Sequence, residues 1–82
     1  MNYQDALNLR RGIGKDQIIN KGMPMKVFIT PAKHEDLLNF LNDYIGGNYT
    51  DDTAKKYSSN GKFKVHGIWT DGANVGYKEL SE

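Results

Sequence analysis

The sequence predicts a small α+β fold in which a mainly antiparallel sheet of about three strands packs against two helices. Three observations predict this class. The run Met25 to Thr30 is rich in β-branched and aromatic residues, which favours a buried strand. A helical periodicity then follows from Pro31 to Gly47. Apolar residues alternate with polar ones from Lys62 to Thr70 and again from Val75 to Leu80, which is typical of a β-hairpin.

The length of 82 residues fits one domain covering residues 1–82, and a chain this short buries only about 60–65% of its unfolded surface. The chain has no cysteine, which excludes disulfides and thiolate zinc sites and favours a reducing compartment. The first residues lack the order of a signal peptide, and no apolar run reaches the roughly 20 residues that span a bilayer. We therefore expect a cytoplasmic protein without membrane contact.

The central helix is expected to begin with Thr30 as its N-cap and Pro31 in the first helical position. Glycine accepts the left-handed C-cap conformation, so Gly46 and Gly47 predict the end of the helix. Three- and four-residue spacings predict an apolar side made of Leu37, Leu38, Leu41, Tyr44 and Ile45. The opposite side is expected to present Lys33, Asp36, Asn39 and Asp43 to solvent.

The flanking segments are shorter. Residues 2–11 predict a helix that Asn2 caps and Gly12 ends. The Ile18–Ile19 pair indicates either a short strand or a single helical turn, doubling back toward the Met25 strand. Residues 51–59 fit a short helix and a loop almost equally well, because few apolar residues are available to face a core.

The C-terminal hairpin is expected to direct Phe63, Val65 and Trp69 inward, with turn residues between its strands. Gly67 and Gly76 indicate a bulge or the close approach of another backbone. The order of the strands in the sheet is left open by the sequence.

Catalytic motifs are incomplete. The Gly12–Lys15 segment lacks the spacing of a phosphate-binding loop, and Leu38 stands where a zincin motif starting at His34 needs its second histidine. Both His34 and His66 are expected on the surface, so the sequence predicts no catalytic residues, no metal site and no cofactor. Enzyme activity would require both histidines and an acid to converge in the fold.

The simplest interpretation of the glycines after the first helix is a C-cap and turn. Gly12, Ile13, Gly14 and Ile18 also resemble the glycine hairpin of the helix-hairpin-helix DNA-binding family. That resemblance implies that the backbone amides of the turn face a nucleic-acid phosphate.

The net charge of +1 conceals an uneven distribution, because residues 35–52 contain acidic but no basic side chains and both flanking regions are basic. A small domain without a catalytic constellation more often binds a macromolecule than converts a substrate. We therefore predict a noncatalytic protein-binding or regulatory module. The predicted partner-binding residues are charged helix residues and hairpin-region tyrosines: Glu35, Asp36, Asp43, Tyr57 and Tyr77. The Asn- and Lys-rich composition is also associated with phage and mobile-element proteins.

The alternative prediction is a nucleic-acid-binding accessory protein. Lysine and arginine side chains bind phosphates, and tyrosines interleaved with lysines can stack bases. The residues predicted for this role are Arg10, Arg11, Lys15, Lys21, Lys62 and Lys64. The oligomeric state is not predicted.

Overall fold

The computed structural model describes residues 1–13, 16–19, 23–50, 52–70 and 74–80. Within these residues the elements are α1 (Tyr3–Ile13), β1 (Asp16–Ile19), β2 (Met23–Pro31), α2 (His34–Ile45), α3 (Thr53–Tyr57), β3 (Phe63–Thr70) and β4 (Val75–Glu79). The predicted α+β class, with an antiparallel sheet and helices packed on it, is confirmed. The segment around residues 51–59 contains the short helix α3.

The sheet is antiparallel and has the order β1-β2-β3-β4, so each strand lies beside its neighbour in the sequence. The Ile18 region forms strand β1 and pairs with β2, which confirms that it doubles back. The second strand is longer than expected: it begins at Met23 and includes Pro24.

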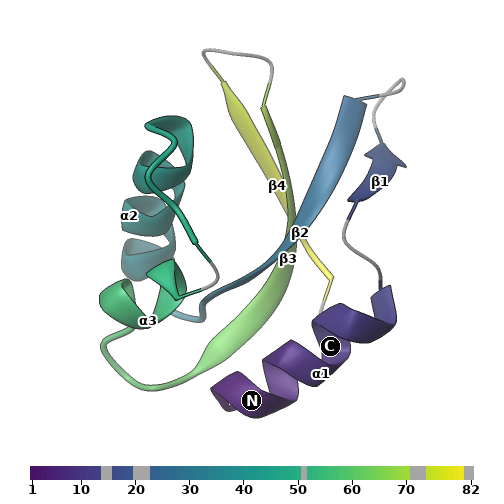
Figure 1. Cartoon of the computed structure of the whole chain (residues 1–82). Helices are drawn as coiled ribbons and strands as arrows, with labels where there is room; N and C mark the ends of the chain where they lie inside the picture. Colours follow the sequence, from purple (N-terminus) through teal and green to yellow (C-terminus); the bar gives the residue numbers. More distant parts are fainter. Residues whose placement is uncertain (14–15, 20–22, 51, 71–73, 81–82) are drawn as a thin grey trace.

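The helices cover both faces of the sheet, with α2 and α3 on one side and α1 on the other (Figure 1). The ring of Phe28 in β2 contacts Phe40 and Tyr44 of α2, at centroid distances of 6.1 and 5.4 Å. Phe28 pairs with His66, and alternate residues of a strand face opposite sides. Phe63 therefore lies on the other face, where its ring contacts Tyr3 of α1 at 5.2 Å.

The start of α2 differs from the prediction. Thr30 is fully buried and Pro31 belongs to β2, because both residues continue the pairing with β3. The helix begins three residues later than Pro31, and its N-cap is Lys33. The end is as predicted: Gly46 is the C-cap, and Gly47 has a positive φ of 77°.

The orientation of α2 about its axis also differs from the prediction. Leu37, Phe40 and Leu41 are buried, but Leu38 is 45% exposed and Ile45 is 52% exposed. The side that faces the sheet therefore follows the positions 37, 40, 41 and 44. Two of the five residues assigned to the apolar side lie in solvent instead.

Helix α1 begins as predicted, because the Asn2 side-chain oxygen accepts a 2.8 Å hydrogen bond from the Asp5 amide. Gly12 does not end the helix, which continues through Ile13. A strand, β1, occupies the position of the second helix of a helix-hairpin-helix motif. The structure therefore does not support that resemblance, and Gly14 and Lys15 lie outside the described residues.

The two hairpin glycines are explained by side chains. A Cβ atom on Gly67 would collide with the side chain of Met25, and one on Gly76 would collide with the indole ring of Trp69. The expectation of a bulge or a nearby backbone is therefore wrong. Each glycine makes room for a large side chain that lies across the sheet.

Candidate functional site

Asp36 points inward, not into solvent as the sequence predicts. The residue is only 9% exposed, and its carboxylate accepts hydrogen bonds from the Ser59 hydroxyl at 2.8 Å and the Ser59 amide at 3.0 Å. These bonds, chiefly the hydroxyl bond, hold the pKa of Asp36 below its usual value of 3.8, although burial opposes the shift. Asp36 therefore fastens the segment between α3 and β3 to the first turn of α2.

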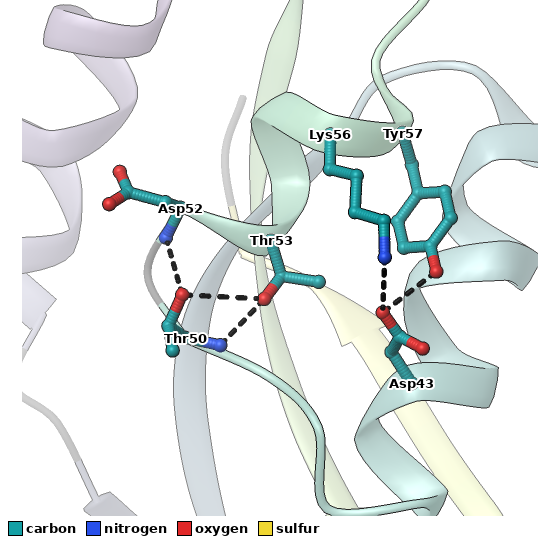
Figure 2. Close-up of polar contacts among 6 residues, drawn as sticks. All are labelled: Asp43, Thr50, Asp52, Thr53, Lys56 and Tyr57. Carbon is teal, nitrogen blue, oxygen red and sulfur yellow. Dashed lines mark hydrogen bonds and ion pairs between the residues drawn. The ribbon is translucent and has the colours of Figure 1, made fainter.

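Asp43 and Tyr57 contact each other and join α2 to α3 (Figure 2). The Tyr57 hydroxyl donates a 2.7 Å hydrogen bond to the Asp43 carboxylate, and the Lys56 ammonium lies 3.8 Å from the same carboxylate. This hydrogen bond is the main reason that the pKa of Tyr57 is raised above 10.0. The carboxylate of Asp43 is thus occupied by contacts within the chain.

A second set of polar contacts organises the start of α3, also shown in Figure 2. The Thr50 amide donates a 2.6 Å hydrogen bond to the Thr53 hydroxyl, and the Asp52 amide donates a 3.3 Å bond to the Thr50 hydroxyl. Such short side-chain bonds to the backbone are how threonine begins a helical turn. These residues therefore have a structural role in starting α3.

Two of the predicted partner-binding residues are accessible. Glu35 lies in the first turn of α2, is exposed, and forms only a loose 3.8 Å ion pair with Lys33. Tyr77 lies on β4 and is 38% exposed. The five predicted residues therefore do not form one surface: Asp36, Asp43 and Tyr57 connect parts of the fold, whereas these two face solvent.

The apolar side chains exposed on α2 are the feature that the sequence interpretation missed. Leu38 and Ile45 are seven residues apart, which places them on one side of the helix about 10 Å from each other. The positions 37, 40, 41 and 44 already match the i, i+3, i+4, i+7 pattern of a sheet-facing side. Including Phe40 in the pattern completes a sheet-facing side without Leu38 and Ile45. This is the sequence signal that could have shown that these two residues lie outside the core.

His66 is buried at 4% exposure, which contradicts the predicted surface position. Its Nδ1 atom lies 2.6 Å from the Thr30 hydroxyl oxygen, and that hydroxyl is also 3.3 Å from the Lys64 carbonyl oxygen. The ring of Tyr77 covers His66 at a centroid distance of 5.9 Å. Burial lowers the pKa of His66 below 6.5, with a smaller upward effect from Glu79 and a smaller downward effect from Lys64.

The stability of the fold is expected to fall in mild acid because of His66. Its folded-state pKa is below 6.5, so the unfolded chain binds the proton first as the pH falls through 6.5, and unfolding becomes more favourable. Thermal melts from pH 8 to pH 5 are the measurement. His66→Gln, which does not titrate, should have a shallower pH dependence than the wild type. Equal slopes in the two proteins would contradict this assignment.

The two histidines lie in different environments. His34 is exposed in the first turn of α2, whereas His66 is buried in β3. No group of three or more histidine, cysteine, aspartate or glutamate side chains could hold a metal ion in the part of the chain that the structure describes.

The basic residues of the alternative prediction are spread over the molecule. Arg10 and Arg11 lie in the last turn of α1. Lys62 lies near the other end of that helix, because the next residue, Phe63, donates its amide to the Met1 carbonyl oxygen at 3.0 Å. A helix of 11 residues is about 16 Å long, so these cations do not share one patch.

Lys64 is part of the sheet surface. Its ammonium lies 3.4 Å from a carboxylate oxygen of Glu79, and its own residue is half-buried. Lys15 and Lys21 lie outside the described residues.

Comparisons of the chain with protein-family models, with curated proteins and with solved structures gave no significant match. Among the residues that the structure describes, none of the helices has the length and apolar character needed to cross a bilayer.

Proposed function

We propose that this chain is a noncatalytic protein-binding module and that the outer side of α2 is its docking surface. The observation that carries the proposal is the exposure of Leu38 and Ile45 on one side of that helix. Asp36 and Asp43 are directed toward α3 and its loop, so the opposite side of the helix faces away from α3. A pair of exposed large apolar side chains with a polar surround is typical of a protein interface.

The surround of this pair is polar. Exposed Glu35 and Asn42 lie beside this pair on α2. Asn39, which stands three residues after Asp36 and four before Asp43, lies nearer the side that faces α3. A few well-packed, buried side chains supply most of the affinity of a protein interface, while rim charges such as Glu35 act mainly on the rate of association. The partner that fits this surface is therefore a protein segment with an apolar side.

The test is capture of partners from a lysate of the source organism by the immobilised chain, with and without nuclease. The amount of partner captured by the double variant Leu38→Glu/Ile45→Glu should be about tenfold lower than for the wild type, or lower still, because burying a carboxylate opposes binding. The matched control is Asn8→Glu/Asn39→Glu, which adds the same charge at exposed positions and should bind as the wild type does.

Two results would overturn the proposal. Equal capture by the wild type and by the Leu38→Glu/Ile45→Glu variant would exclude the outer side of α2 as the docking surface. Loss of all capture after nuclease treatment would favour the nucleic-acid alternative, with Arg10, Arg11 and Lys62 as the next residues to replace.

A further inference from the structure

Strand β4 lies at an edge of the sheet, and among the described residues it pairs only with β3. The Leu80 amide donates a 2.8 Å hydrogen bond to the Val65 carbonyl oxygen, toward β3. Backbone groups alternate in direction along an antiparallel strand. The amides and carbonyls of Val75, Tyr77 and Glu79 therefore point away from the sheet, where another strand can pair with them.

We propose that this edge pairs with the same edge of a second copy of the chain, on a twofold axis at Tyr77. In this register Val75 lies opposite Glu79 of the second copy, Gly76 lies opposite its Lys78, and the two Tyr77 residues face each other. The pairing forms about six backbone hydrogen bonds and joins two sheets into one. An interface made from the same patch on both subunits closes as a dimer.

The side chains fit this register. Gly76 carries no side chain, and the indole ring of Trp69 lies over it. Trp69 pairs with Gly76, and Lys78 pairs with Gly67, so Trp69 and Lys78 lie on one face of the sheet. The second copy's Lys78 therefore projects beside Trp69, at a position suited to a cation–π contact. Within the described residues, no carboxylate lies within ion-pair distance of Lys78.

Lys78 disfavours a neighbouring register. Moving the twofold axis by one residue to Lys78 places the two ammonium groups directly opposite each other, which is unfavourable. The axis at Tyr77 also pairs every residue of β4 from Val75 to Glu79. The aromatic pair at its centre adds a favourable cross-strand contact.

The test combines sedimentation with amide hydrogen exchange on the full chain between roughly 10 µM and 1 mM. We expect monomers at the lower end and dimers at the upper end. The amides of Tyr77 and Glu79 should exchange at least tenfold more slowly in the dimer. The Lys78 amide, which points toward β3, is the internal control and should be protected at both concentrations. The emission of Trp69, the one tryptophan in the sequence, should change over the same range.

Variants separate this pairing from other modes of association. Tyr77→Pro removes an outward amide that the β3–β4 pairing does not use, so it should remain monomeric, whereas Tyr77→Phe should dimerise like the wild type. Lys78→Glu keeps the backbone intact and places a carboxylate beside Trp69, so its dissociation constant should rise at least tenfold. If circular dichroism shows that Tyr77→Pro does not fold, Lys78→Glu still tests whether the β4 edge forms the dimer.

Three outcomes would overturn the proposal. They are a monomer at 1 mM, a dimer that neither Tyr77→Pro nor Lys78→Glu weakens, and open-ended assemblies, which indicate pairing between unlike edges. The Leu38→Glu/Ile45→Glu variant should still dimerise, so failure of the edge pairing and failure of the α2 docking surface are distinguishable.

Discussion

Replacing Phe40 with alanine is expected to lower the free energy of unfolding by about 3–5 kcal/mol. Phe40 is fully buried on the sheet-facing side of α2, and its ring packs edge-on against Phe28 at 6.1 Å. The truncation removes this aromatic contact and leaves a cavity. Because small proteins are stable by only about 5–15 kcal/mol, this single change removes a large fraction of the total. Urea titration monitored by circular dichroism is the measurement.

The matched control is Leu38→Ala, on the same helix. Leu38 is 45% exposed, so this truncation should change the stability by about 0.5 kcal/mol or less. The pair also tests the orientation of α2. A large loss of stability for Leu38→Ala with a small loss for Phe40→Ala would mean that Leu38, and not Phe40, faces the sheet. The orientation of α2 about its axis would then be the one predicted from the sequence.

Gly67→Ala is expected to destabilise the fold by about 1–3 kcal/mol through overpacking. The added methyl group would collide with the Met25 side chain, which is 2% exposed and therefore has little room to move. Alanine reduces the conformational freedom of the unfolded chain, which stabilises the protein by only about 0.4–1 kcal/mol. The collision outweighs this gain, so the net change in stability is a loss. The shift in the denaturation midpoint measures the effect.

Two further variants isolate the cause. Gly12→Ala, at a helical position with nothing within 4 Å of the added atom, should stabilise the protein by about 0.5 kcal/mol. Met25→Ala should reduce the effect of Gly67→Ala, as a double-mutant cycle will show. An effect of Gly67→Ala that persists in the Met25→Ala background would point to the backbone of β3 instead.

The sequence predicts best those features that depend on neighbouring residues. The cap at Asn2, the left-handed Gly47 and the strands β3 and β4 all follow local rules of spacing and conformation. At the start of α2, strand pairing with a distant segment overrides the local preference for a helix. Thr30 and Pro31 suit a helix start, but pairing with β3 keeps both in the sheet and the helix begins at His34.

The candidate surfaces could be predicted only in part, because their residues depend on partners far away in the sequence. Asp36 lies on the polar side of a helical wheel, yet its partner Ser59 is 23 residues away. His66 alternates with apolar residues as a surface position would, but Thr30 and Tyr77 enclose it from β2 and β4. The exposure of Leu38 depends on the rotation of α2 about its own axis, which tertiary contacts of this kind determine.

Helix α3 is too short to be stable on its own, so its contacts with other helices decide whether it stays folded. Its five residues are far fewer than the roughly 12–15 that an isolated helix needs, so tertiary contacts must keep it folded. Tyr57 ties it to Asp43 of α2, and the Lys55 ammonium lies 4.0 Å from the centre of the Tyr3 ring in α1. A local opening of α3 would break both contacts without requiring the strands to separate. Because α3 contacts helices on both faces of the sheet, its opening would release one contact of α2 and one contact of α1 together.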